Sequence, residues 1–494
     1  MSLISVNNLT FYYENSYDNI FNEVTFHIDT DWKLGFIGRN GRGKTTFLNL
    51  LMGKYEYVGN ITSKVTFDYF PYVIPESLMK EDTIWVIDYM DSNYELWKIC
   101  RELNLMHMEA DLLYRPFITL SNGERTKVML AVLFSKENNF LLIDEPTNHL
   151  DLEARENVRD YLKLKKGFIL VSHDRFLLDD CITHVLVINK TNISVEQGNF
   201  STWWENKKRQ DEFELAENIR LKKDIIRLSE AAKRTEGWSD QIEKSKIGSH
   251  AGDRGFIGHK AAKMMKRAKS IESRMENAVE DKSKLLKNIE TTSELKMFPL
   301  THHKDVLIEA KDLAIIYGEK QITEGVNFKL MSGDCMVLTG PNGCGKSSII
   351  KKIMGEDIAS CGELMIAGGL KLSYVSQDTS HLKGTLHQFV EENNMDMTLF
   401  KTILRKLDFE RSQFEKNMED FSAGQKKKVL LAKSFSEQAH VYILDEPLNY
   451  IDIFSKMQIE ELVLEYKPTL LLVEHDKAFV EKVCTEIVEI KKKI

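Results

Sequence analysis

A glycine-rich loop occurs twice in this chain, and the residues that follow the loop repeat with it. The two loops, GRNGRGKT and GPNGCGKS, span residues 38–45 and 340–347. Lys44 and Lys346 are 302 residues apart, and Asp144 and Asp445 are 301 residues apart. A nearly constant offset of this kind indicates that one domain of about 200 residues occurs twice. We therefore place the first domain at 1–200, a unique segment at 201–300 and the second domain at 301–494.

Each repeat has the pattern of an α/β domain. Short apolar runs such as 168–171 and 470–473 alternate with glycine loops and helical stretches, which is typical of a mainly parallel sheet flanked by helices. In a Gly-x-x-x-x-Gly-Lys-Ser/Thr loop, the backbone N–H groups surround phosphate oxygens, the lysine reaches the outer phosphates, and the final hydroxyl is suited to Mg²⁺. The predicted ATP-binding residues of the two loops are Gly38, Asn40, Gly41, Gly43, Lys44, Thr45 and Thr46, and Gly340, Asn342, Gly343, Gly345, Lys346, Ser347 and Ser348.

An acidic pair follows an apolar strand in each repeat, in FLLIDEP and VYILDEP. We expect Asp144 and Asp445 to hold Mg²⁺ together with Thr45 and Ser347. The adjacent Glu145 and Glu446 are predicted to polarise the water that attacks the γ-phosphate. Two acidic residues at a strand end are often only a solvated turn. The two aspartates follow the phosphate-loop lysine of their repeat by 100 and 99 residues, and this near-equal distance favours the catalytic interpretation.

A histidine follows a further apolar strand in each repeat, His173 in VSHD and His475 in VEHD. A single histidine at a strand end is usually structural or exposed. Because the pair recurs at matching positions, we predict that both histidines contact the γ-phosphate.

The middle segment has the periodicity of a helical hairpin. Apolar residues recur with three-four spacing from 261 to 289, and again between 221 and 232. The stretch between them carries Gly248, Gly252, Gly255 and Gly258, which suit a reversing tip rather than a helix interior. Arms of roughly 30 to 40 residues would project about 45 to 60 Å. The predicted fold class is thus α/β, with two tandem P-loop ATPase domains joined by a long antiparallel α-helical hairpin.

The segments LSNGE (120–124) and FSAGQ (421–425) resemble the signature motif of ATP-binding-cassette (ABC) proteins. The resemblance implies that two ATP sites form between facing halves, so that Ser121 and Gly123 complete the site of Lys346, and Ser422 and Gly424 complete the site of Lys44. It also implies a monomer with an intramolecular cassette dimer. Tyr13 and Tyr317 match the adenine-stacking aromatic of that family. The alternative for these two residues is a core tyrosine on a first strand.

One position departs from the family pattern. Gln377, in SYVSQ, stands where the family has a glutamine that contacts Mg²⁺, but the first repeat reads DYFPY and has Tyr72 there. A tyrosine cannot offer an amide oxygen to the metal. We therefore expect the Lys44 site to hydrolyse ATP more slowly or to hold its metal through water.

Two cassettes joined by such a hairpin resemble the ABC-F subfamily, and most closely the Lsa-type antibiotic-resistance proteins. The residues that carry this likeness are GRNGRGKTT, DEPLNYID, KAAKMMKRAK and THHK. The resemblance implies binding at the exit site of the 70S ribosome, contact with 23S rRNA, and a hairpin that reaches the peptidyl-transferase centre. It implies displacement of peptidyl tRNA and release of pleuromutilins, lincosamides and group A streptogramins.

Charge favours a hairpin that faces nucleic acid. Residues 201–300 hold 22 basic and 17 acidic side chains, whereas the whole chain has a formal net charge of −8. Basic side chains neutralise phosphates, although a solvated coiled-coil face is the alternative. The apolar Phe256 and Ile257 on the tip also suggest a partner. The predicted ribosome and tRNA contacts are Lys244, Lys246, Arg254, Phe256, Ile257, Lys260, Lys263, Lys266 and Arg267.

Other functions remain open on the sequence. An ATPase subunit of a transporter with a separate membrane subunit would share the cassettes but has no evident use for a basic hairpin. An ABC-F translation factor without a resistance role would share everything. A DNA-repair ATPase typically carries its coiled coil between phosphate loop and signature, but those intervals are only 77 and 76 residues here.

Composition points to a protein without a membrane segment of its own. No stretch approaches the roughly 18 consecutive apolar residues that a spanning helix needs. The six cysteines form no Cys-x-x-Cys pair, which favours thiols in a reducing compartment. We expect a cytoplasmic, ribosome-associated protein that uses ATP and Mg²⁺.

Overall fold

The computed structural model describes residues 2–13, 19–137, 139–148, 150–189, 191–245, 266, 274, 295–318 and 320–493, with the backbone alone for 228–245. The chain divides into two compact units. One unit combines Met1–Trp203 with Thr292–Ile494, and the other is Trp204–Thr291. The predicted division at 1–200, 201–300 and 301–494 stays a prediction.

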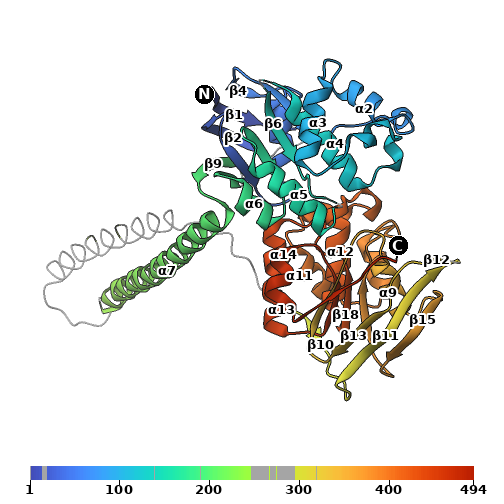
Figure 1. Cartoon of the computed structure of the whole chain (residues 1–494). Coiled ribbons are helices and arrows are strands. Elements are labelled where there is room, and N and C mark those ends of the chain that lie inside the picture. Colours follow the sequence, from blue (N-terminus) through green and yellow to red (C-terminus); the bar gives the residue numbers. More distant parts are fainter. Residues whose placement is uncertain are drawn as a thin grey trace, which may run out of the picture. The chain divides into compact units, whose positions relative to one another are not determined.

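The first half contains two sheets (Figure 1). The smaller sheet is antiparallel, in the order β2-β1-β4. The larger sheet has the order β5-β6-β7-β3-β8-β9 and is parallel except for the last pair. The strands are β1 (Leu3–Phe11), β2 (Phe21–Asp29), β3 (Lys33–Ile37), β4 (Val58–Thr62), β5 (Thr66–Phe70), β6 (Asn139–Asp144), β7 (Phe168–Val171), β8 (His184–Asn189) and β9 (Asn192–Gln197).

The second half repeats this arrangement. A parallel sheet of order β16-β18-β19-β14-β20 lies beside an antiparallel one in which β11 pairs with β12, β13 and β15. The strands are β11 (Val306–Tyr317), β12 (Lys320–Gln321), β13 (Val326–Met331), β14 (Cys335–Thr339), β15 (Ser360–Ile366), β16 (Leu372–Val375), β18 (Val441–Asp445), β19 (Leu470–Val473) and β20 (Glu486–Glu489). The short β10 (Phe298–Pro299) pairs with β17 (Gln438–Ala439).

Helices flank both large sheets. In the first half they are α1 (Lys44–Leu51), α2 (Thr83–Met90), α3 (Leu96–Leu105), α4 (Asn122–Ser135), α5 (Leu152–Lys163) and α6 (Arg175–Cys181), with the 3₁₀ helices η1 (Glu76–Leu78), η2 (Ala110–Tyr114) and η3 (Phe117–Thr119). In the second half they are α9 (Lys346–Ile353), α10 (Leu386–Glu392), α11 (Met397–Lys406), α12 (Ala423–Ser436), α13 (Ile453–Tyr466) and α14 (Lys477–Val483), with η4 (Arg411–Glu415) and η5 (Met418–Asp420). The predicted α/β class is confirmed.

Motif residues also start the helices that follow them. The hydroxyl of Ser121 accepts a hydrogen bond from the Glu124 amide, and the Glu124 carboxylate accepts one from the Ser121 amide. Ser422 and Gln425 form the same capping box on α12. Such boxes satisfy two amides that a helix start otherwise leaves unpaired. The signature serine of each half therefore also determines where α4 and α12 begin.

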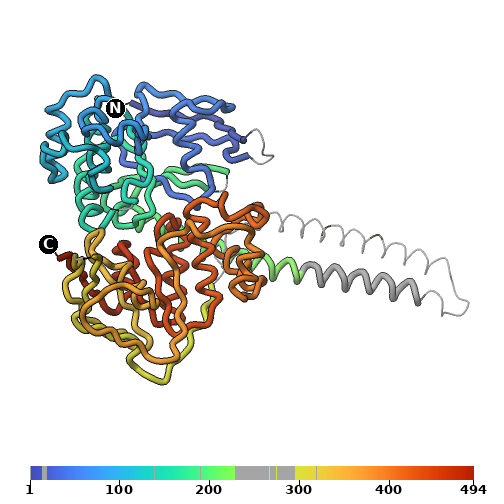
Figure 2. Tube along the Cα trace, turned by 90° about the vertical axis from the view of Figure 1, so that its right-hand side faces the viewer, coloured from blue at the N-terminus to red at the C-terminus, as the bar shows by residue number. Residues whose placement is uncertain are grey.

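The segment after the first half is one long helix, α7, of 46 residues (Phe200–Ser245), whose first part is drawn in green in Figure 2. At 1.5 Å per residue its length is about 69 Å. It exceeds the predicted arm because it already begins at Phe200, before the apolar seam. The predicted return arm falls on residues outside the described part of the chain, apart from Lys266 and Arg274, which are both helical and exposed. No helix in the described ranges has the length and apolar character that crossing a bilayer requires.

Candidate active sites

Each phosphate loop joins a central strand of the parallel sheet to the helix behind it. The Lys44 ammonium donates to the Gly38 carbonyl at 2.6 Å, and Lys346 donates to Gly340 at 2.7 Å. Gly43 and Gly345 precede α1 and α9 with φ of 94° and 99°. That backbone conformation strongly favours glycine, and a Cβ on Gly345 would lie 2.6 Å from Thr323 Cγ2. The loops thus present helix N-terminal amides and one lysine to a common space, as phosphate binding requires.

The predicted metal residues of each half lie together. The Thr45 hydroxyl donates to Asp144 Oδ2 at 3.1 Å, and Ser347 hydrogen-bonds Asp445 in the second half. Burial raises the pKa of Asp445 to about 6. Asp445 Oδ1 is buried without a hydrogen-bond partner in the described part of the chain. A buried carboxylate oxygen that lacks a donor fits a cation at this point.

The two predicted catalytic glutamates adopt an unusual backbone conformation. Glu145 has φ of 51° and Glu446 has φ of 47°. Their amides hydrogen-bond the ends of the neighbouring strands, at Val171 and Val473, with distances of 2.8 and 2.9 Å. Non-glycine residues in this left-handed region are uncommon and cluster at functional sites. The backbone of each glutamate is therefore fixed by the strand that leads to the predicted histidine.

Each histidine lies near the glutamate of its own half. His173 Nε2 is 3.3 Å from Glu145 Oε1, and His475 Nε2 is 4.0 Å from Glu446 Oε1. Burial lowers the pKa of His475 to about 3, and the pKa of His173 also lies well below its usual value because of burial. Burial and the charge of Asp144 raise the pKa of Glu145 to about 8. The imidazoles are thus neutral at pH 7 and can donate one hydrogen bond without adding a positive charge.

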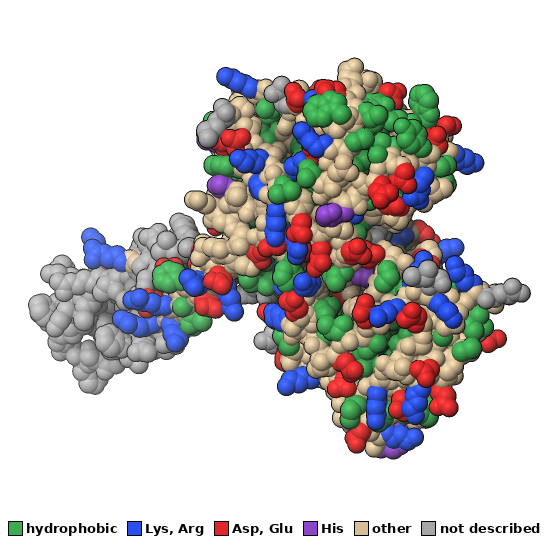
Figure 3. All heavy atoms as spheres, viewed as in Figure 1, with side chains coloured by type: hydrophobic (Ala, Val, Ile, Leu, Met, Phe, Trp, Pro, Cys, Tyr) green, Lys and Arg blue, Asp and Glu red, His purple; other side chains and the backbone are tan. Residues whose placement is uncertain are grey.

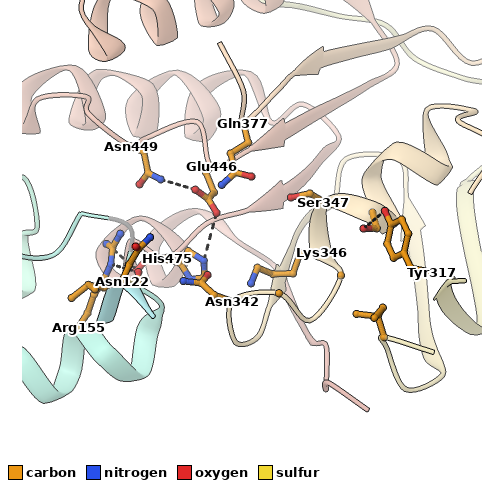
Figure 4. Close-up of a pocket in the computed structure, with 15 residues that line it drawn as sticks. Asn122, Arg155, Tyr317, Asn342, Lys346, Ser347, Gln377, Glu446, Asn449 and His475 are labelled. Carbon is orange, nitrogen blue, oxygen red and sulfur yellow. Dashed lines mark hydrogen bonds and ion pairs between the residues drawn. The ribbon is translucent and has the colours of Figure 1, made fainter. Parts of the chain in front are cut away.

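A pocket of about 540 Å³ surrounds the second phosphate loop and includes residues of both halves. Figure 4 shows Asn122 and Arg155 entering from the first half, beside Asn342 and His475. Glu446, Gln377 and Ser347 lie between these residues and Tyr317, which lies on the opposite side of the view. Asn122 follows the signature residue Ser121 directly, which fits the expected pairing of this signature with Lys346. The remaining lining residues are Leu150, Ile322, Gly343, Gly345, Lys346, Ser348 and Asn449.

The opposite site has the matching contacts. The Asn40 amide donates to the Tyr450 carbonyl at 3.0 Å, which joins the first phosphate loop to the second half. A Cβ built on Gly424 would lie 2.5 Å from Tyr450 O and 3.6 Å from Asn40 Nδ2. The second signature therefore lies against the first phosphate loop, as expected for Ser422 and Lys44. In the first signature, a Cβ built on Gly123 would lie 3.4 Å from the Ala154 Cβ.

The two expected adenine-binding tyrosines occupy equivalent places. The Tyr13 hydroxyl is 2.9 Å from Thr46 Oγ1, and the Tyr317 hydroxyl is 3.0 Å from Ser348 Oγ. Both side chains are exposed, so neither is a core tyrosine. Each hydroxyl is tied to the helix that follows its phosphate loop, which leaves ring surface for a planar base.

Tyr72 lies away from the metal residues of the first half. Its hydroxyl donates to Asp68 at 2.9 Å, and Lys136 lies 3.0 Å from that hydroxyl and 2.6 Å from the Asp68 carboxylate. A different residue, Tyr69, donates its hydroxyl to Asp144 Oδ2 at 2.9 Å. Sequence reasoning missed Tyr69. The pairing of β5 with β6 brings Tyr69 close to the end of β6, and that pairing is not visible in the sequence.

Two basic side chains cross between the halves. The Lys456 ammonium donates to the His173 carbonyl at 2.9 Å and to Asp476 Oδ2 at 2.8 Å. Arg155, which is 301 residues before Lys456, lies 3.5 Å from the His475 carbonyl in the same manner. Each therefore connects its own half to the histidine loop of the other. Neither residue belongs to a motif recognised in the sequence, although the repeat offset of 301 residues pairs them.

The predicted hairpin contacts can be placed only in part. Lys244 lies in α7 and Lys266 is helical and exposed. Lys246, Arg254, Phe256, Ile257, Lys260, Lys263 and Arg267 lie outside the described residues.

Comparisons with known proteins agree with this geometry. The family model described as ABC transporter matches residues 21–148 and 323–449. The chain is 27% identical over 477 residues to the ribosome protection protein VmlR of Bacillus subtilis (strain 168), covering 95% of this chain and 84% of VmlR. It is 24% identical over 524 residues to the energy-dependent translational throttle protein EttA of Haemophilus influenzae, covering 95% and 89%. Its fold resembles the archaeal ribosome recycling factor aABCE1, solved with the ribosomal stalk protein aP1, with a TM-score of 0.63, 17% identity and coverage of 98% and 88%.

Proposed function

The chain belongs to the ABC transporter family and, within it, to the ABC-F subfamily, and from this premise we propose that it is an ATP-driven protein that acts on the ribosome. The two tandem ABC domains confirm the predicted fold class and support ATP hydrolysis as the activity. In the proposed function, the protein enters the exit site of the 70S ribosome, contacts 23S rRNA, and uses its hairpin to displace peptidyl tRNA. Pleuromutilins, lincosamides and group A streptogramins then leave the peptidyl-transferase centre.

The pocket shared by the two halves carries this proposal. ATP bound by Lys346 lies against residues of the first half, because Asn122 and Arg155 line the same space. Because ATP contacts both halves, its binding energy favours the state in which the two halves are closed on each other. Hydrolysis of ATP removes this binding energy. A device that closes with ATP and opens after hydrolysis suits a protein that must bind a large partner and then leave it.

The side chains divide the chemistry among them. Lys44 and Lys346 neutralise the outer phosphates, and the histidines donate a hydrogen bond to the γ-phosphate. In their ionised forms, Glu145 and Glu446 orient the attacking water and accept its proton. The buried Asp445 Oδ1 fits Mg²⁺. Thr45 and Asp144, and Ser347, Asp445 and Gln377, would hold Mg²⁺, which supplies positive charge against the phosphates when bound.

Relatives and charge support the ribosome as partner. The two relatives named above are a ribosome protection protein and a translational throttle protein. The hairpin segment has a net positive charge while the chain as a whole is acidic. A transporter subunit remains the rival, but it gives that positive charge no role.

Two assays test the proposal together. A drug-sensitive bacterium is grown on pleuromutilin, lincosamide and streptogramin A with and without this gene, and the purified protein is pelleted with 70S ribosomes in ATP. We expect a raised inhibitory concentration and co-pelleting that declines with salt. Protection without pelleting contradicts a ribosomal mechanism, whereas pelleting without protection favours a translation factor.

A tip exchange separates the hairpin from the ATPase. Replacing residues 244–260 by a short Gly-Ser turn should leave ATPase activity nearly intact, because the flanking seams remain. Ribosome binding should weaken in part, and drug protection should be lost. Full protection at matched expression would show that the tip is not the effector.

A further inference from the structure

Helix α2 of the first half exposes large aromatic side chains. Trp85 and Tyr89 lie four residues apart, on one side of the helix, with exposed fractions of 59% and 55%. Tyr114 and Ile118 are exposed to 69% and 51%. We name these four residues the α2 face. Figure 3 shows hydrophobic side chains gathered over the part of the molecule where Figure 1 labels α2 and α3.

Backbone hydrogen bonds place the two segments that carry the α2 face side by side. The Thr83 amide donates to the Arg115 carbonyl at 2.9 Å, and the Ile118 amide donates to the Met79 carbonyl at 2.7 Å. The start of α2 is thereby fixed beside the segment 114–118. The α2 face is built from two adjacent segments rather than from scattered side chains.

The second half provides an internal control for the α2 face. Helix α10 buries Phe389 and Val390 where α2 buries Val86 and Ile87. The positions that match the α2 face are nevertheless polar and exposed: Gln388, Glu392, Glu415 and Glu419. The fold therefore does not require apolar residues there. Exposed apolar groups that a fold does not need usually mark a binding surface.

The charges around the α2 face select the kind of partner. Residues 82–115 hold seven acidic and three basic side chains, and of the acidic ones Glu102 is buried in an ion pair with Lys165. Asp88 and Asp111 are exposed beside the aromatic residues. Acidic side chains repel the phosphates of RNA and attract lysine and arginine.

The aromatic rings add a second attraction for cations. On the neighbouring helix, Lys98 Nζ and Arg101 Cζ lie 5.6 and 5.5 Å from the centre of the Trp97 ring. Rings of this kind bind ammonium and guanidinium groups through their faces. The exposed rings of the α2 face can do the same for cations of another molecule.

We propose that the α2 face docks on a basic protein of the ribosome, which contributes lysine or arginine together with apolar side chains. This inference rests on the proposed function and names the class of component that the first half contacts. RNA and a second copy of this chain are the competing occupants, and the experiment distinguishes them.

Photo-crosslinking identifies the occupant. Tyr89 is replaced by p-benzoylphenylalanine, and the protein is irradiated with 70S ribosomes in ATP. The matched control carries the same probe at Glu392, the equivalent position of the second half. We expect adducts between position 89 and a basic ribosomal protein, and at least about tenfold fewer at position 392. Adducts only with RNA or with another copy of the chain would overturn the proposal.

Substitutions test the energetics of the α2 face. Trp85→Gln with Tyr89→Gln and Tyr114→Gln should weaken co-pelleting about tenfold while leaving ATPase activity unchanged, because none of the three lies in the ATP sites. The variant W85F/Y89F/Y114F should retain binding, since phenylalanine keeps the ring. Asp88→Asn with Asp111→Asn should weaken binding less and reduce its salt dependence. Equal binding by the glutamine and phenylalanine variants would overturn the proposal.

Different results would contradict the docking of the α2 face and the proposed function. If the unmodified protein does not pellet with ribosomes, the proposed function fails. The position-89 probe is then irradiated with free ribosomal proteins extracted from 50S subunits. Adducts that disappear in the W85Q/Y114Q background support the α2 face as a basic-protein site. Their absence overturns the proposed docking surface.

Discussion

The two ATP sites contain the same motif residues but differ in the side chains around them. In the first site, Tyr69 occupies one oxygen of Asp144, and Tyr72 is held by Asp68 and Lys136. In the second site, Gln377 lines the pocket with Glu446. A repeat can thus keep its phosphate loop while one copy has a structural tyrosine at the position of the glutamine that is predicted to hold Mg²⁺.

Two equivalent lysines, Lys127 and Lys428, also have different hydrogen-bond partners in the two halves. Lys428 forms a buried ion pair with Asp452 at 3.0 Å, whereas Lys127, 301 residues earlier, donates to the Met106 carbonyl. Asp151, the counterpart of Asp452, accepts at 3.4 Å from the Asn342 amide across the interface. Asp452 is thus paired with a lysine of its own half, whereas Asp151 caps α5 and also accepts a hydrogen bond from the opposite phosphate loop.

The largest expected effect removes both glutamates. Glu145→Gln with Glu446→Gln should retain ATP binding, lower turnover about 10²- to 10⁴-fold and hold the protein on ribosomes, because glutamine cannot accept the proton. Phosphate release and ribosome pelleting measure the two results. Hydrolysis at the unmodified rate would refute the role assigned to the glutamates. The two sites could then not be compared through these residues.

Breaking the buried ion pair should destabilise the second half. Lys428→Met leaves Asp452 charged and buried, which costs about 3 to 5 kcal/mol. Lys127→Met should cost only about 1 kcal/mol, since it loses a single hydrogen bond to a carbonyl. Thermal unfolding midpoints at pH 7 compare the two variants. Equal shifts would show that the two lysines do not differ in importance.

The same pair predicts a pH dependence. Burial raises the pKa of Asp452, but the charge of Lys428 outweighs it and holds that pKa well below its usual value. A depressed carboxylate pKa adds stability above the unfolded-state pKa of about 4, and this stability is lost as the pH falls. The stability difference between K428M and the unmodified protein should therefore be full at pH 7 and shrink below about pH 4.

Single glutamate variants test the asymmetry of the sites. Glu446→Gln should reduce ATPase activity several-fold more than Glu145→Gln, because only the second site has Gln377 for Mg²⁺. Steady-state rates at saturating Mg²⁺ and ATP provide the comparison. Equal losses would mean that Tyr72 has no kinetic consequence.

The smallest effect concerns Tyr69. In the Glu446→Gln background, Tyr69→Phe should lower the Mg²⁺ concentration for half-maximal activity about two- to tenfold, since the Asp144 oxygen loses a competing donor. Tyr374→Phe in the Glu145→Gln background is the control. Within the described residues, the structure gives the Tyr374 hydroxyl no hydrogen bond to Asp445. An unchanged Mg²⁺ dependence for Y69F would show that Tyr69 does not contribute to the difference between the two sites.

The α2 face extends the comparison beyond the ATP sites. Trp85 and Tyr89 were not singled out in the sequence, because apolar residues on a helix are more often core than surface. Gln388 and Glu392 lie 303 residues after them, so the offset of 301 or 302 residues between the motifs does not pair these positions, whereas the matching bridges Asp82–Pro116 and Thr385–Asn417 do. Only the structure shows that both sets are exposed.

The sequence by itself determined the features that depend on neighbours along the chain. Gly43 and Gly345 predict the phosphate loops, and Asp144 and Asp445 follow runs that must be strands. The periodicity around residue 221 predicts the helix that α7 forms. The hairpin that would follow it, and the roles of the site residues, stay predictions.

Tertiary structure decided the contacts between distant segments. Tyr69 rather than Tyr72 meets Asp144 because the β5–β6 register places it there. Lys456 reaches the His173 carbonyl because the two halves face each other, although 283 residues separate them. Such contacts depend on strand order and on how helices pack. Residue types along the chain carry little information about either.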